Sequence, residues 1–161
     1  MTRWPRGFTL VELLVVLVIV ALAGGLAIVT LDRDERRLAA REAKRFAGAL
    51  EFAAARAQAR NETLGVSADS AIRFWRREPS GDRWLPLDDE VLAPRALPEP
   101  LIAAPIMYAG QRIPADAIVP FRASGRNEPF AFRLMSSSWL VVLAADPLNR
   151  VSIEGPTPNP P

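Results

Sequence analysis

The chain has 161 residues and a formal net charge of +2, and it contains neither cysteine nor histidine. The usual general base, the commonest metal ligand and every histidine-dependent nucleophile are therefore absent. We expect no enzymatic activity, no catalytic residue, no metal and no cofactor. The pI of about 9.9 does not indicate nucleic-acid binding, because the arginines are scattered among acidic residues rather than gathered in one stripe.

The first predicted element is an apolar helix over residues 8–31, in which the only polar side chains are Thr9, Glu12 and Thr30. At about 1.5 Å per residue it is about 36 Å long, which exceeds the about 30 Å of a bilayer's hydrocarbon core. Arg3 and Arg6 precede it without a compensating acid. The sequence therefore predicts a single membrane span with a cytoplasmic N-terminus and the remainder of the chain outside.

Two other interpretations of this segment remain open. Ala21-Leu22-Ala23 before Gly24 fits the cleavage site of a secretory signal peptide. A plain membrane anchor that tolerates Glu12 near the headgroups is the other. The apolar run that continues to Leu31 argues against a signal peptide. Glu12 argues against it too, because a charge inside an apolar helix costs about 2.5–3.5 kcal/mol on insertion scales.

The junction Gly7-Phe8-Thr9-Leu10-Val11-Glu12 resembles the class III leader junction of type IV pilins and type II secretion pseudopilins. The resemblance implies that prepilin peptidase removes residues 1–7 by cutting after Gly7. It also implies that the enzyme methylates the new amine of Phe8. Glu12 would lie one helical turn from that amine, and two pairings are open: one within the chain and one with a neighbouring subunit. The resemblance implies the second pairing, and thus an assembly role for Glu12.

A second, amphipathic helical segment is predicted over residues 32–61. Its apolar positions recur at four- and three-residue steps and form one stripe: Ala39, Ala43, Phe46, Leu50, Ala53 and Ala57. Charged residues fall off this stripe, so we expect the helix to dock on a sheet. Asn61 and Gly65 are suitable terminators of the helix.

A β domain is predicted over residues 62–154, where short apolar runs alternate with turns rich in Pro, Gly, Asp and Ser. The predicted strands cover residues 72–76, 84–87, 118–122, 130–134, 139–143 and 149–153. Residues 123–127 are expected to close a hairpin between the third and fourth of these. Asp88-Asp89-Glu90 lacks the alternate ligand spacing of a calcium loop, so we interpret it as a solvated loop. Residues 155–161 are predicted to be a disordered tail.

Later segments narrow the resemblance to the minor pseudopilin H family of type II secretion systems: residues 72–98, 120–125 and 129–134. It implies an α+β, pilin-like fold, in which a long N-terminal helix packs on a small antiparallel β domain of two sheets. The implied location is the Gram-negative inner membrane, with a periplasmic domain. The implied role is that of a structural subunit at the tip, or at the tip–shaft junction, of a pseudopilus that exports folded proteins across the outer membrane. The implied partners are prepilin peptidase, the major pseudopilin, other minor pseudopilins and the inner-membrane assembly platform.

The main alternative is a minor type IV pilin that serves pilus assembly, twitching or DNA uptake. Without Arg3 and Arg6 the 20 basic residues fall to 18, equal to the 18 acidic ones. This neutrality disfavours a DNA receptor, and the stretch Trp84-Leu85-Pro86-Leu87-Asp88-Asp89 favours secretion. An unrelated single-span protein with a β domain is a third possibility.

Overall fold

The computed structural model describes residues 10–79 and 83–160, and for residues 23–32 it describes the backbone alone. The chain divides into two units, Met1–Glu35 and Arg36–Pro161, and we refer to the second as the folded domain. Helix α1 (Leu10–Ala59) contributes to both. It ends close to the predicted Asn61, which adopts a left-handed conformation (φ 52°). This is a common way of ending a helix, and the N–H of Glu62 donates to the carbonyl of Ala57 at 3.0 Å.

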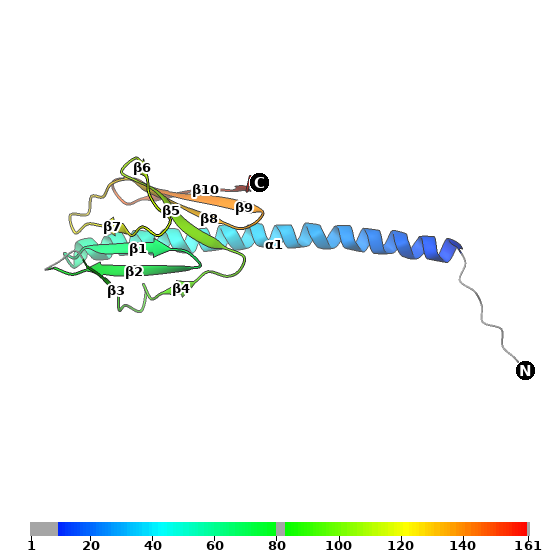
Figure 1. Cartoon of the computed structure of the whole chain (residues 1–161), viewed down its shortest axis with the longest axis horizontal. Helices are drawn as coiled ribbons and strands as arrows, with labels where there is room; N and C mark the ends of the chain where they lie inside the picture. The colour runs from blue at the N-terminus through cyan, green and yellow to red at the C-terminus, as the bar shows by residue number, and fades with distance from the viewer. Residues whose placement is uncertain (1–9, 80–82, 161) are drawn as a thin grey trace, which may run out of the picture. The chain divides into compact units, whose positions relative to one another are not determined.

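The folded domain consists of residues 36–59 of α1 and two antiparallel sheets that lie along it (Figure 1). The first sheet comprises β1 (Leu64–Ala68), β2 (Ala71–Arg77), β3 (Trp84–Pro86), β4 (Arg95–Ala96) and β7 (Val119–Phe121). The second comprises β5 (Ile102–Tyr108), β6 (Gln111–Arg112), β8 (Phe130–Met135), β9 (Trp139–Ala145) and β10 (Val151–Pro158). The strand orders are β3-β2-β1-β7, with β4 also paired to β2, and β10-β9-β8-β5-β6. The predicted α+β class, with a helix packed on two small antiparallel sheets, is confirmed.

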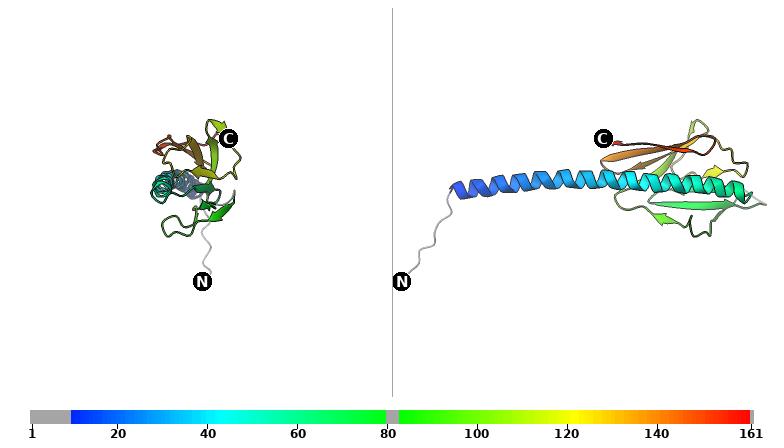
Figure 2. Two further views of the ribbon diagram at one scale, coloured as in Figure 1. Left: turned by 90° about the vertical axis from the view of Figure 1, so that its left-hand side faces the viewer. Right: turned by 180° about the vertical axis from the view of Figure 1, so that it is seen from behind.

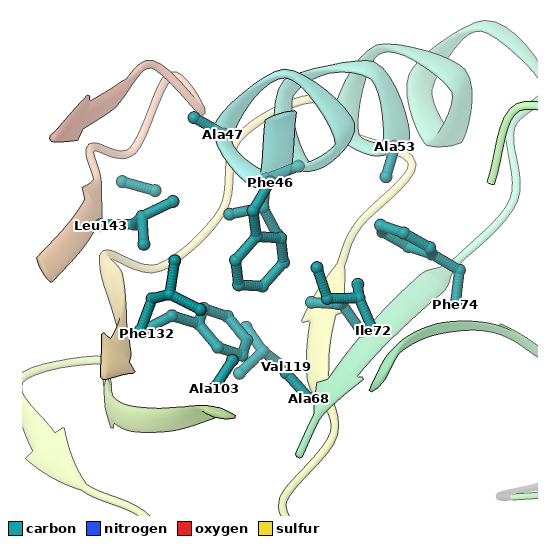
Figure 3. Packing of buried hydrophobic residues seen from close by; sticks show 14 of the residues in the cluster. Phe46, Ala47, Ala53, Ala68, Ile72, Phe74, Ala103, Val119, Phe132 and Leu143 are labelled. Carbon is teal, nitrogen blue, oxygen red and sulfur yellow. The ribbon is translucent and has the colours of Figure 1, made fainter. Parts of the chain in front are cut away.

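The predicted apolar stripe of the helix is the centre of the core. Its six residues, Ala39, Ala43, Phe46, Leu50, Ala53 and Ala57, are at most 1% exposed. Phe46 meets Phe132 of β8 edge to face, with ring centroids 5.2 Å apart, and Figure 3 shows the two side chains between the helix and the strands. Phe130 contacts Phe132 and also Phe121 of β7. The aromatic rings therefore join the helix to both sheets.

The predicted hairpin around residues 123–127 is wrong. β7 pairs with β1, with Val119 opposite Val66, whereas β8 pairs with β5 and β9. The loop between them crosses from one sheet to the other. The buried side chain of Asn127 holds this loop, because its Oδ1 accepts from the N–H of Arg122 at 2.6 Å. Turn residues reverse the direction of the chain both in a hairpin within one sheet and in a loop that crosses to another sheet. They therefore do not specify which sheet the next strand joins.

The predicted disordered tail is also wrong as far as residue 160. β10 continues to Pro158, which pairs with Trp139 after a register shift between Glu154 and Thr157. Gly155, with φ 106°, lies inside this shift, and a Cβ there would stand 2.8 Å from the carbonyl oxygen of Leu140. Glycine therefore allows the chain to resume pairing after the bulge. Asn159 then donates from its backbone N–H to the carbonyl of Ser138 at 2.8 Å.

Candidate functional site

The leader junction predicted from the sequence falls largely outside the described residues. Gly7 and Phe8 lie in the part that the structure does not describe, so cleavage and methylation at these positions stay predictions. Glu12 lies in the first turn of α1. The unpaired backbone N–H groups of that turn carry partial positive charge, which favours a carboxylate there.

The first turns of α1 carry an apolar surface on every side. Eleven large aliphatic side chains there are between 48% and 82% exposed: Leu10, Val11, Leu13, Leu14, Val15, Val16, Leu17, Val18, Ile19, Val20 and Leu22. A helix that is apolar all round is stable when lipid or other helices cover it. Over the residues that the structure describes, no helical stretch has both the length and the apolar character that crossing a membrane requires. The predicted span, residues 8–31, lies partly outside those residues and stays a prediction.

Asp89, in the cluster interpreted as a solvated loop, is instead a structural residue. Its carboxylate forms an ion pair with Arg56 of α1, and the two side chains are only 15% and 8% exposed. Oδ1 of Asp89 also accepts from the N–H groups of Val91 and Leu92, each at 2.9 Å. Nε of Arg56 donates to Oε1 of Glu62 at 3.0 Å. The interpretation of this loop as solvated is therefore wrong for Asp89.

A second ion pair, buried on the side of Glu42 and partly exposed on the side of Arg95, joins α1 to β4. Glu42 is 3% exposed although it lies off the apolar stripe. Its Oε2 accepts from Nη1 of Arg95 at 2.5 Å, and its Oε1 accepts from Nη1 of Arg45 at 3.3 Å. With Asp89 and Arg56, this pair fixes both ends of the segment between β3 and β4 to the helix. Helical periodicity does not predict either ion pair, because the two residues of each pair lie far apart in the sequence.

Two further carboxylates stabilise turns. The Arg73 side chain, which donates to Oδ2 of Asp69 at 2.8 Å, lowers the pKa of that carboxyl, and the N–H of Ala71 lowers it further. Backbone donation from Arg150 lowers the pKa of Asp146, with the Arg150 side chain and the N–H of Leu148 adding to the effect. Within the described residues, no three acidic, histidine or cysteine side chains are grouped so that they could hold a metal. The hydrogen bonds of Asp69 and Asp146 to nearby backbone N–H groups hold their two turns.

Comparison with known proteins finds two families that match parts of this chain. Residues 42–147 match the family described as type II transport protein GspH. Residues 5–28 match the prokaryotic N-terminal methylation motif, which includes Gly7, Phe8 and Glu12.

Two curated relatives carry the name type II secretion system protein H. The protein from Escherichia coli (strain K12) is 39% identical over 90 residues, a match that covers 53% of each chain and so about half of that relative's length. The protein from Pectobacterium carotovorum subsp. carotovorum is 27% identical over 172 residues, which cover 88% of this chain and 89% of the relative.

Solved structures of pilin-like proteins share the fold. The minor pseudopilin EpsH from the type 2 secretion system of Vibrio cholerae aligns with a TM-score of 0.58 at 17% identity, over 74% of this chain and 96% of that one. The type IV minor pilin FimU of Pseudomonas aeruginosa aligns with a TM-score of 0.52 at 16% identity, over 79% of this chain and 94% of that one. At these identities the likeness concerns the fold alone.

Proposed function

This chain belongs to the GspH family of type II transport proteins and is a minor pseudopilin, and we propose that it lies at the tip, or at the tip–shaft junction, of a type II secretion pseudopilus. There it acts as a structural subunit in the export of folded proteins across the outer membrane. The observation that carries this proposal is the family match over residues 42–147, on a domain whose buried helix stripe and two sheets form a pilin-like fold.

The same proposal assigns the chain to the Gram-negative inner membrane. Residues 1–7 serve as a leader that prepilin peptidase removes, and residues 8–31 cross the membrane once. The N-terminus is cytoplasmic, and the domain that follows is periplasmic. Three observations support this arrangement: the match to the methylation motif over residues 5–28, the uncompensated Arg3 and Arg6 and the exposed apolar surface of the first turns of α1.

We assign the assembly contact to Glu12 and the methylated amine of Phe8. In the fibre, the carboxylate of one subunit meets the terminal amine of its neighbour, so that two charges inside an apolar bundle neutralise each other. The inner-membrane assembly platform moves the subunit out of the bilayer, and the major and other minor pseudopilins replace lipid around its apolar helix.

A deletion strain tests this function against the minor type IV pilin, which the fold shared with FimU keeps as the second candidate. We expect deletion to trap exoproteins in the periplasm while twitching and DNA uptake continue. Complementation with the full chain restores export, and complementation with the variant Gly7→Leu does not, because the leader stays attached. Normal export together with lost motility would instead assign the protein to a type IV pilus system.

A further inference from the structure

The chain enters the folded domain beside the turn between β8 and β9. Arg36 is the first residue of the domain, and its guanidinium stacks over the ring of Trp139, with Cζ 5.2 Å from the ring centroid. Trp139 begins β9 directly after the turn, which comprises residues 136–138. The other end of the chain reaches the same place, because the side chain of Asn159 donates to the carbonyl of Ser136 at 2.9 Å. Figure 2 shows the C-terminal end of β10 there.

Apolar side chains lie on both faces of the second sheet beside this turn. Ile102, Met135 and Leu140 follow one another across β5, β8 and β9 in the strand register, so they share one face of the sheet. Val141, the next residue of β9, is buried on the opposite face, and Trp139 packs against the core on that side. Ile102 is nevertheless 47% exposed. We call the six residues Arg36, Ile102, Met135, Trp139, Leu140 and Asn159, together with the turn, the entry end of the domain.

The backbone of the turn already has hydrogen-bond partners inside the domain. The N–H of Ser136 donates to the carbonyl of Trp139 at 2.8 Å. The N–H groups of Ser138 and Trp139 donate to Oγ of Ser136, at 3.3 and 3.0 Å. Asn159 donates to the carbonyls of Ser136 and Ser138, at 2.9 and 2.8 Å. Because a polar group that already has its partner loses little on leaving water, this turn can enter a layer that holds little water.

We propose that the entry end docks in the headgroup layer of the membrane from which the chain emerges, and that it does so before the subunit joins the fibre. The ligand is the phosphodiester of a phospholipid, which the guanidinium of Arg36 binds, because that planar group matches the oxygens of a phosphate. Trp139 lies at the same level, where membrane proteins are enriched in tryptophan. The exposed side chain of Ile102 contacts the acyl boundary. The proposal rests on the proposed function, because it uses the membrane span over residues 8–31.

The length of the connecting chain places the entry end at this layer. Five residues separate the end of the span, at residue 31, from Arg36. They cover at most about 18 Å when extended and about 7.5 Å at the rise of an α-helix. The headgroup layer is about 5–8 Å thick on each side of the hydrocarbon core. A protein of the assembly platform is the competing occupant, and vesicles that contain lipid alone distinguish between the two.

Spin labelling of the full chain tests the proposal. Because the chain contains neither cysteine nor histidine, a single introduced cysteine carries the nitroxide, and a nickel-chelating lipid holds its metal in the headgroup layer. The variant Ser137→Cys labels the exposed tip of the turn, and Leu148→Cys labels an exposed position beyond the other end of β9. Both are reconstituted in vesicles of phosphatidylethanolamine and phosphatidylglycerol. We expect nickel to relax the label at residue 137 at least about fivefold more strongly, because about 20 Å of strand separates the two positions.

Matched variants in the Ser137→Cys chain separate docking from folding. Ile102→Glu should lower the relaxation about threefold, because a carboxylate has to stay hydrated. Ile153→Glu is the control, since this isoleucine of β10 is 37% exposed and lies opposite Leu143, away from the entry end, and it should leave the relaxation unchanged. Arg36→Gln should also lower the relaxation, because it removes the charge that attracts the phosphate. The midpoint of thermal unfolding shows that each variant is folded.

The outcomes separate this proposal from the membrane span on which it rests. Equal relaxation of the two labels, in a chain that alkaline carbonate does not extract from the vesicles, overturns the proposal and leaves the span intact. Unchanged relaxation in both Ile102→Glu and Arg36→Gln overturns it as well. A chain that carbonate extracts contradicts the span of the proposed function, and this proposal with it.

Discussion

The carboxylate of Asp89 lies against the guanidinium of Arg56, and this ion pair ties the loop before β4 to the helix. Because the Arg56 side chain is only 8% exposed, loss of Asp89 removes one of its two carboxylate partners in a poorly hydrated site, where Glu62 still accepts from Nε. We expect Asp89→Ala to lower the free energy of unfolding by about 1–3 kcal/mol. Chemical denaturation of the full chain in detergent measures the change. Asp88→Ala, at the exposed neighbouring position, is the control, and equal losses from both variants would contradict the structural role of Asp89.

Truncation of two phenylalanines of the same helix should change the stability of the domain by very different amounts. Phe46 is fully buried against Phe132, so Phe46→Ala should cost about 3–5 kcal/mol of stability. Phe52 is 44% exposed, and Phe52→Ala should change stability by less than about 0.5 kcal/mol. Thermal unfolding of both variants provides the comparison. A large loss for Phe52→Ala in the isolated chain would mean that this side chain serves the domain itself.

Gly155 tests whether the end of the chain is part of the sheet. Gly155→Ala combines a strained φ with a contact of 2.8 Å to the carbonyl oxygen of Leu140, and we expect a loss of about 1–3 kcal/mol. Gly110→Ala has a similar positive φ but open space around its Cβ, so it should cost less. Hydrogen exchange of β10 and β9 measures the local effect. Unprotected amides in residues 151–158 of the unsubstituted chain would contradict the strand.

Stability should depend on pH in the acid range through Asp69 and Asp146. Their hydrogen bonds lower the pKa of both carboxyls in the folded chain below the ordinary value of 3.8. The stabilisation is therefore present above that value and is lost as the pH falls through it towards the folded pKa. We expect the free energy of unfolding to decline between about pH 5 and pH 3. The double variant Asp69→Asn/Asp146→Asn should flatten this decline, and an unchanged slope would show that other groups control it.

The buried face of the helix can be predicted from helical periodicity, whereas the contacts between segments distant in the sequence cannot. The spacing of Ala39, Phe46 and Leu50 identifies the buried stripe, because one face of a helix is a local property of the chain. The pairing of β7 with β1 depends on which strand edge is available, and no local pattern encodes that. Residues of the predicted tail are ordered by pairing with β9, which composition alone cannot reveal.

The candidate site shows the same division. Gly7, Phe8 and Glu12 form a compact motif and were therefore accessible from sequence. Asp89 and Arg95 find their partners on α1 only after the chain has folded.

Glu12→Ala tests the proposed assembly contact directly. The variant removes a charge from an apolar helix, so insertion and cleavage should proceed normally. Incorporation into the fibre should fall strongly, because the amine of a neighbouring subunit loses its partner. Comparing processed subunit in membranes with subunit in sheared fibres gives the ratio. Glu12→Gln keeps the shape without the charge and should behave like the alanine variant, and wild-type incorporation of either one would remove the assembly role of Glu12.

The intact mass of the protein purified from native membranes tests the central claim most directly, because it reports cleavage and methylation together. We predict the mass of residues 8–161 carrying one methyl group on the amine of Phe8. A mass that corresponds to the chain from Met1, or to a chain that begins at Gly24, would contradict the assignment of this protein as a processed pseudopilin.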